Sequence, residues 1–174
     1  FGILRIEDRY GNVLKKFGPK REEVLSAETA YLMTDLMQTV MNRGTGGSAR
    51  WKYLFNHPAA GKTGTTQGWS DAWFVGFTPN IAAGIWFGVD DYRVSLGKGQ
   101  DGSRAALPAW AEFMRDAHKE LGLPHDKFER PENIIDFEIC SVTKSSPWPN
   151  CPLETEIFKK GTEPTRKCKI HKTY

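Results

Sequence analysis

The chain lacks any long hydrophobic run, since no stretch approaches the roughly 18 apolar residues of a membrane-spanning helix. It also lacks an excess of one charge, because 24 Lys and Arg nearly balance 21 Asp and Glu, for a net charge of +3. No basic run is interleaved with aromatic residues as a nucleic-acid-binding stripe would be. These absences argue against a membrane span within these residues and against a nucleic-acid partner.

Cysteine is scarce, and its three copies all lie after Leu123. If this segment is extracytoplasmic, the spacing favours a disulfide between Cys140 and Cys151, which leaves Cys168 over. The stretch from Cys168 to His171 has the spacing of a metal-binding pair, but no second pair of that kind accompanies it. We therefore expect no metal and no other cofactor.

The chain has no initial methionine and no basic leader, and Phe1-Gly2-Ile3-Leu4 opens directly into strand-like sequence. We therefore expect Phe1 not to be the natural N-terminus and the chain to be a piece of a longer protein.

Hydrophobic periodicity and turn residues predict an ordered first part, residues 1–122, with a hairpin, a helix, three strands and a final helix. Ser26 is a plausible N-cap for the first helix, which has a methionine-rich apolar stripe expected to pack in the core. The predicted ranges are 1–6 and 13–17 for the hairpin, 26–42 and 106–121 for the helices, and 59–65, 72–78 and 81–89 for the strands. The stripe consists of Leu32, Met33, Leu36, Met37, Val40 and Met41. The second helix has Trp110, Ala111, Phe113, Met114, Ala117 and Leu121 on its apolar face.

Residues 123–174 differ in composition, because they hold six of the ten prolines and all the cysteines. We expect this second part to be an irregular C-terminal tail on the surface. Six Lys and Arg among its last sixteen residues are interpreted as a solvated stretch rather than as a contact with an anionic polymer.

The most informative stretch runs from Ala59 to Thr66, where one cation and three hydroxyls lie among residues with almost no side chain. Glycine permits close approach of a ligand to the backbone, and lysine and threonine offer donors to an anion. Strongly strand-like sequence follows from Asp71. The pattern predicts a carboxylate receptor built into a sheet.

A phosphate-loop interpretation of Gly61-Lys62-Thr63 is disfavoured. That loop requires a glycine where this chain has Asn56, and it requires a helix directly after the lysine. Residues 64–68 are poor helix formers, and a strand comes next.

The run KTGTTQGWSDAWFVGFTP, from Lys62 to Pro79, closely resembles the third signature of penicillin-binding proteins, in particular the bifunctional class A peptidoglycan synthases. The resemblance covers about residues 1–120 well and the tail in weaker form. Further matching segments are Met41–Gly46, Gly84–Asp91, Ala105–Trp110 and Phe158–Pro164.

The resemblance implies an α+β fold, with an antiparallel sheet packed against helices as in penicillin-binding transpeptidases and serine β-lactamases. It also implies a serine D,D-transpeptidase of cell-wall synthesis, which cross-links peptidoglycan stem peptides ending in D-Ala-D-Ala and is acylated by β-lactam antibiotics. The implied location is extracytoplasmic, on the outer face of the bacterial cytoplasmic membrane. A glycosyltransferase domain and a membrane anchor would precede this chain in the same protein.

Carried over by position, Lys62 and Thr65 are the catalytic candidates. Lys62 would set the positive potential and help the proton relay, and the N–H of Thr65 would supply half of the oxyanion hole. The hydroxyls of Thr63 and Thr65 would hold the terminal carboxylate. Gly64 would let the substrate lie flat on the strand, and Thr66 completes the substrate-binding set.

The same family needs Ser-x-x-Lys for its nucleophile and Ser-x-Asn for proton relay. The formal matches Ser95–Lys98 and Ser141–Lys144 lie in a glycine-rich loop and in the tail, both after the lysine strand, and no Ser-x-Asn occurs. We therefore expect the nucleophile in an N-terminal remainder of the protein and no acylation by this chain alone. The main alternative is a non-catalytic anion-binding or regulatory module with the same sheet; a serine β-lactamase fits less well because of the long tail.

Overall fold

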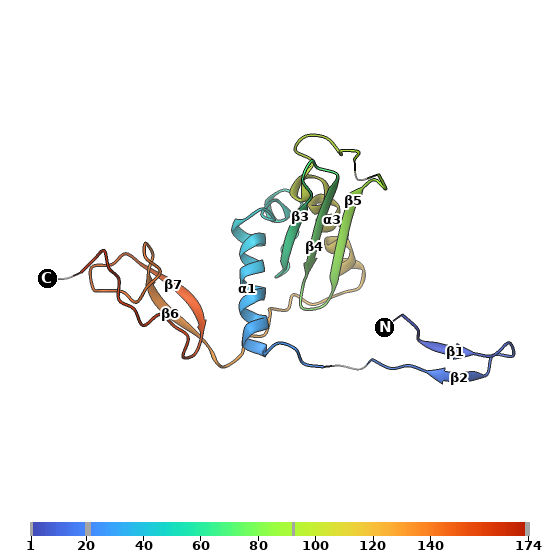
Figure 1. The fold of residues 1–174 in the computed structure, drawn as a ribbon, viewed down its shortest axis with the longest axis horizontal. Helices are drawn as coiled ribbons and strands as arrows, with labels where there is room; N and C mark the ends of the chain where they lie inside the picture. The colour runs from blue at the N-terminus through green and yellow to red at the C-terminus, as the bar shows by residue number, and fades with distance from the viewer. Residues whose placement is uncertain (1, 20–21, 92, 173–174) are drawn as a thin grey trace.

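The computed structural model describes residues 2–19, 22–91 and 93–172. All strand pairs in these residues are antiparallel, within sheets of order β1-β2, β3-β4-β5 and β6-β7 (Figure 1). The elements are β1 (Arg5–Glu7), β2 (Val13–Lys16), α1 (Ala27–Arg43), α2 (Ser48–Trp51), β3 (Ala60–Thr65), β4 (Asp71–Phe77), β5 (Ala82–Gly88), the π-helical turn η1 (Gly102–Ala106), α3 (Leu107–Glu120), β6 (Ile134–Cys140) and β7 (Leu153–Lys159). The fold is therefore mixed α+β, as predicted.

The predicted N-terminal hairpin is confirmed, and Figure 1 draws it apart from the central sheet. Its turn is closed by the Asp8 carboxylate, which accepts hydrogen bonds from the backbone N–H groups of Tyr10 at 2.8 Å and Asn12 at 2.9 Å. Such an aspartate replaces backbone partners that the turn itself lacks.

Helix α1 begins where the sequence predicts, because the Ser26 hydroxyl accepts from the N–H of Thr29 and so caps the first turn. The predicted core packing of its methionine-rich stripe is wrong for part of the stripe. Met41 is fully buried, but Met33 and Leu36 are 54% and 62% exposed. These two side chains are therefore on the surface of the chain and not in its core. Within the described residues, no helix combines the length and apolar character that crossing a membrane requires.

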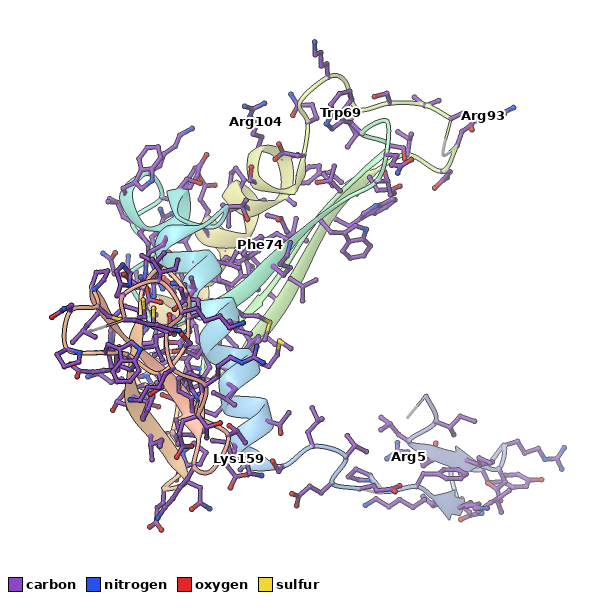
Figure 2. All side chains as sticks on the ribbon, turned by 60° about the vertical axis from the view of Figure 1, so that its left-hand side comes forward. Arg5, Trp69, Phe74, Arg93, Arg104 and Lys159 are labelled. Carbon is purple, nitrogen blue, oxygen red and sulfur yellow. The ribbon has the colours of Figure 1, made fainter. Side chains whose placement is uncertain are left out.

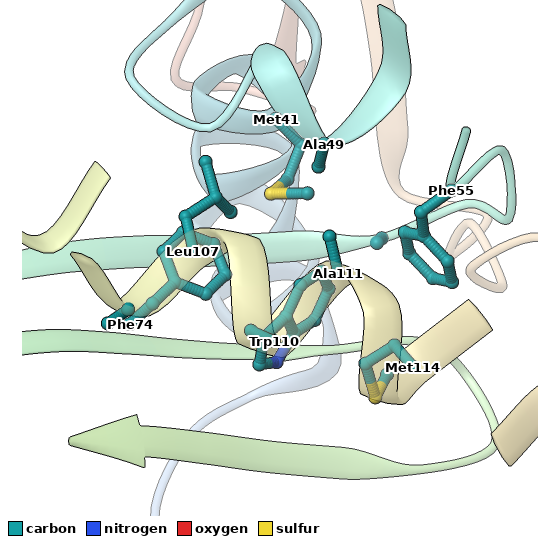
Figure 3. Packing of buried hydrophobic residues seen from close by; sticks show 10 residues of the cluster. Met41, Ala49, Phe55, Phe74, Leu107, Trp110, Ala111 and Met114 are labelled. Carbon is teal, nitrogen blue, oxygen red and sulfur yellow. The ribbon is translucent and has the colours of Figure 1, made fainter. Parts of the chain in front are cut away.

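The predicted strands of the central sheet are confirmed to within one residue at each end. Strand β4 lies in the middle, and its side chains alternate between a buried face, with Ala72 and Phe74, and an exposed face, with Trp73 and Val75. Helix α3 covers the buried face (Figure 3). One face of the sheet thus remains open.

Trp110 of α3 is the centre of the core. Its ring packs edge-on against Phe74, with the ring centroids 4.9 Å apart, and its indole N–H donates to the Ala83 carbonyl at 3.1 Å. A Cβ at Gly76 would lie 2.6 Å from the Trp110 ring, so only glycine leaves room for it.

The predicted apolar face of α3 needs one correction. Phe113 and Leu121 are 53% and 65% exposed, whereas His118 is buried at 2%. The histidine is tolerated in the core because both ring nitrogens have partners: Thr78 Oγ1 at 3.1 Å from Nε2 and the Met114 carbonyl at 2.8 Å from Nδ1.

The tail, expected to be irregular, consists largely of turns and loops but also contains the β6-β7 sheet, in which Cys140 pairs with Leu153. It contacts the start of α1 through the Glu28 carboxylate. That group accepts from the Asn133 side chain at 3.2 Å and lies 3.6 Å from the Lys159 ammonium. Figure 2 labels Lys159.

The predicted Cys140–Cys151 disulfide is not formed, because both thiols are free, as is that of Cys168. The fold gathers the sulfur atoms of all three cysteines into one cluster with His171 instead of isolating a pair.

Candidate functional site

The candidate site lies on β3, which is an edge strand of the central sheet. The N–H of Thr66 donates to the Asp71 carbonyl at 3.1 Å, so Thr66 faces β4 in the hydrogen-bonding ladder. Because backbone direction alternates along a strand, Gly64 and Lys62 face β4 as well, and the N–H groups of Thr63 and Thr65 point away from the sheet. The Thr65 N–H therefore has the orientation that an oxyanion hole requires.

Lys62 extends from the open face of the sheet. Its cross-strand partner Val75 is exposed on that face, and the lysine side chain is itself exposed. The Lys62 ammonium donates to the Thr63 carbonyl at 2.9 Å. The cation thus lies along the outer edge of β3, close to the predicted carboxylate-binding hydroxyls.

The Thr65 side chain is held from the opposite face. Its register partner is Ala72, which is buried, and the backbone N–H of Gly102 in η1 donates to Thr65 Oγ1 at 3.0 Å. Asp101 fixes η1 there by accepting from the N–H groups of Ser103 at 2.8 Å and Arg104 at 3.1 Å. A hydroxyl that accepts from an amide keeps its own proton free to donate to an anion.

Thr63 lies next to a second hydroxyl group. Its Oγ1 is 3.2 Å from Thr45 Oγ1, in the loop that follows α1. Ligand pockets have volumes of about 300–1,000 Å³, and a hollow of about 620 Å³ opens beside Thr45. It is lined by Gly44, Thr45, Gly47, Ser48, Trp51, Lys52, Tyr53, Ser103 and Arg104. The cations Lys52 and Arg104 suit an anionic ligand there.

Thr66 has a different environment from the other predicted residues. Its hydroxyl lies 2.7 Å from Ser70 Oγ and accepts from the Asp71 N–H at 2.8 Å, inside the β3-β4 turn. The Trp86 indole N–H, with Ser70 and Thr66, lowers the pKa of Asp71, which stays a carboxylate and fastens the turn. The described contacts give Thr66 a role in turn geometry, and its part in substrate binding stays a prediction.

The structure thus brings Lys62, Thr63, Gly64 and Thr65 together along one strand edge and adds two residues that sequence reasoning missed. Thr45 and Gly102 lie 18 and 37 residues from the threonines they contact. The glycine-rich loop around Thr45 and the Asp101-Gly102 step before a helix were the available signals, but neither spacing reveals a contact with β3.

Two family models match the chain. Residues 5–111 match the penicillin-binding protein transpeptidase domain. Residues 130–173 match the C-terminal domain of penicillin-binding protein 1A.

Similar proteins match nearly the whole chain. Penicillin-binding protein 1A of Aquifex aeolicus is 38% identical over 97% of this chain, which covers 22% of that protein. Penicillin-binding protein 2D of Bacillus subtilis is 32% identical over 95% of this chain, which covers 24% of it. The crystal structure of penicillin-binding protein 1A from Haemophilus influenzae superposes with a TM-score of 0.74 at 26% identity, over 95% of this chain and 30% of that one. The chain therefore spans less than a third of the length of these relatives.

The match over residues 5–111 includes every strand of the central sheet, the lysine strand among them. The chain belongs to the penicillin-binding protein transpeptidase family.

Proposed function

We propose that this chain supplies the carboxylate-binding strand of a serine D,D-transpeptidase that cross-links peptidoglycan stem peptides and is acylated by β-lactams. The terminal carboxylate of a D-Ala-D-Ala peptide binds the hydroxyls of Thr63 and Thr65, beside the Lys62 ammonium. The substrate lies flat against Gly64, which has no side chain to obstruct it.

The observation that carries the proposal is the orientation of two groups of Thr65, its backbone N–H and its side-chain hydroxyl. Its backbone N–H points away from the sheet, and its hydroxyl accepts from Gly102 and so keeps a proton to donate. One residue can then bind both the carbonyl oxygen under attack and the carboxylate next to it. An oxyanion-hole donor of this kind is worth about 3 kcal/mol in the transition state.

The nucleophilic serine and its relay partners belong, in this proposal, to the N-terminal remainder of the same protein. That remainder packs on the open face of the sheet, which carries Lys62. The exposure of large apolar side chains on this face supports the arrangement, since Trp73 is 44%, Val75 52% and Trp86 44% exposed.

We further propose that residues 1–122 form the C-terminal part of the transpeptidase domain and residues 123–174 a separate tail. The protein acts outside the cytoplasm. A membrane anchor and a glycosyltransferase domain precede this chain in the same protein.

The test is covalent labelling of the full-length protein with a fluorescent penicillin. Lys62→Ala is expected to abolish labelling while the circular dichroism of the folded protein persists, and the isolated 174-residue chain is expected to remain unlabelled. Ser95→Ala is the matched control. Ser95 belongs to a formal Ser-x-x-Lys match, but its hydroxyl donates to the Gly68 carbonyl at 2.6 Å and fixes a loop, so this variant should label normally.

Undiminished labelling of Lys62→Ala would rule out the proposed role of the lysine strand. A full-length protein that never labels, and whose gene encodes no Ser-x-x-Lys before Phe1, would favour the alternative of a non-catalytic anion-binding module.

A further inference from the structure

The tail contains a cluster that the transpeptidase site does not use. Cys140 ends β6, Cys151 precedes β7, and Cys168 and His171 come from the last loop. The three sulfur atoms and one imidazole nitrogen all lie within 4.8 Å of one another, and Figure 2 draws yellow sulfur atoms close together in the tail. Residues separated by up to 31 positions therefore present four donor atoms to one point.

The distances within the cluster match those around a tetrahedral metal ion. Zn–S bonds of about 2.3 Å and Zn–N bonds of about 2.0 Å, at tetrahedral angles, hold sulfur and nitrogen about 3.5 Å apart. His171 Nδ1 lies 3.5 Å from Cys140 Sγ and 3.4 Å from Cys168 Sγ. His171 Nδ1 is thus nearly equidistant from two sulfur atoms, as one nitrogen ligand is from two thiolates around a shared metal ion.

Backbone N–H groups around the cluster point at sulfur atoms and stabilise them as thiolates. The N–H of Trp148 donates to Cys151 Sγ at 3.2 Å, and the N–H of His171 points at Cys168 Sγ from 3.5 Å. Amide donors to ligand sulfurs are the usual outer contacts of a metal site and fix the orientation of its ligands. The indole of Trp148 shields the cluster and donates to the Cys168 carbonyl at 2.9 Å.

The tail buries few other apolar side chains, since among its described residues only Ile134 and Ile139 are buried besides the three cysteines. The buried cluster here consists of the three cysteines, with Trp148 packed against it as the one partly buried apolar neighbour in the described residues. A segment with so small an apolar core needs a covalent or metal cross-link to fold stably. A disulfide would use two of the cysteines and leave the third buried and unpaired, whereas a metal ion uses all four groups.

We propose that Cys140, Cys151, Cys168 and His171 bind one structural Zn²⁺ ion. Binding releases the three thiol protons and leaves a site with a net charge of −1, which suits the basic residues Arg166, Lys167 and Lys169 around its last two ligands. The donor set is closed, with four protein ligands and no open position, so the ion has a structural role. It fastens the loops to the β6-β7 sheet, which in turn contacts α1.

The test uses the 174-residue chain purified under reducing conditions without chelator. Elemental analysis and native mass spectrometry are expected to find one zinc ion per chain, and exchange for Co²⁺ should give the thiolate-to-cobalt absorption of a tetrahedral site. Removal of zinc by a chelator should increase hydrogen exchange in β6, β7 and the loop around Cys168 and leave exchange in β3, β4 and β5 unchanged.

Cys151→Ser is expected to weaken zinc binding more than tenfold, and His125→Asn, which changes a histidine outside the cluster, should leave it unaltered. If Cys151→Ser does not fold, the zinc content of the unaltered chain decides whether the proposed site binds zinc. A chain without stoichiometric zinc that also fails to bind added Zn²⁺ would overturn the proposal.

Discussion

The backbone N–H of Gly102 donates a 3.0 Å hydrogen bond to the side-chain oxygen of Thr65. This contact joins the turn before α3 to the strand that carries the lysine motif. It fixes the threonine rotamer and leaves the hydroxyl proton free for an anionic ligand.

Replacement of Gly102 by alanine should break this contact. The added Cβ would lie 2.2 Å from the Trp73 carbonyl oxygen and 2.8 Å from that of Gly64, and neither backbone atom can move without distorting the sheet. Overpacking of this kind costs about 1–3 kcal/mol, so urea unfolding of the 174-residue chain should show reduced stability. Labelling of the full-length protein by penicillin should slow as well.

Gly84→Ala is the control for that substitution, because its Cβ would meet only Val75 Cγ2 at 3.5 Å, an ordinary contact. Equal stability of the two variants would contradict the close packing of η1 on β3.

Thr65→Val preserves the shape of the side chain and removes its hydroxyl. Hydrogen bonds to charged groups contribute about 1.5–3 kcal/mol, so acylation of the full-length protein by a β-lactam should slow by roughly 10- to 100-fold. The measurement is the second-order rate of labelling, with Thr39→Val on the exposed side of α1 as the control. An unchanged rate would remove the Thr65 hydroxyl from the proposed site.

Glu28 should make the contact between the tail and α1 depend on pH. Its own backbone N–H at the helix start, the Ser26 hydroxyl, the Asn133 amide and the Lys159 ammonium lower the pKa of this carboxyl to about 2. A lowered carboxyl pKa stabilises the folded state above the ordinary value of 4.5 and loses that effect as the pH falls toward 2.

Protection of β6 and β7 from hydrogen exchange, corrected for the intrinsic pH dependence of amide exchange, should therefore decrease as the pH falls from 4.5 toward 2, the range between the ordinary and the lowered pKa of Glu28. Glu28→Gln should raise exchange at neutral pH and flatten this dependence, whereas Glu120→Gln on the exposed end of α3 should preserve it. An identical pH profile in Glu28→Gln would contradict the assignment.

His57 should make the stability of the first part of the chain fall in mild acid. Burial, followed by the neighbouring His118, His125 and Arg50, lowers the pKa of His57 below 6.5. The unfolded state then binds more protons, so stability is greatest above pH 6.5 and decreases as the pH falls toward the lowered pKa. His57→Phe preserves stacking on Phe55 and should reduce the slope of the urea midpoint against pH. A slope equal to that of the unaltered chain would contradict this prediction.

The local pattern of the sequence determined most of the regular elements. Alternating side chains on residues 71–88, the Ser26 cap and the turn at Thr78-Pro79-Asn80 are signals between neighbours, and the five strands and two long helices of residues 1–122 were predicted from such signals. The short helix α2 and the turn η1 were not predicted. The small, hydroxylated residues around Lys62 likewise predict a strand that accepts an anion, because that chemistry follows from residue types alone.

Tertiary structure decided which distant groups meet. Gly102 reaches Thr65 only because η1 lies across the β3-β4 pair. Cys140 meets His171 only because the bridge between Ser146 and Lys167 brings the last loop back to the end of β6. The exposure of Met33 and Leu36 was decided in the same way, since helical periodicity defines a face but not what covers it. Spacing along the chain carries information about neighbours, whereas a carboxylate site or a four-ligand cluster depends on how separate segments pack.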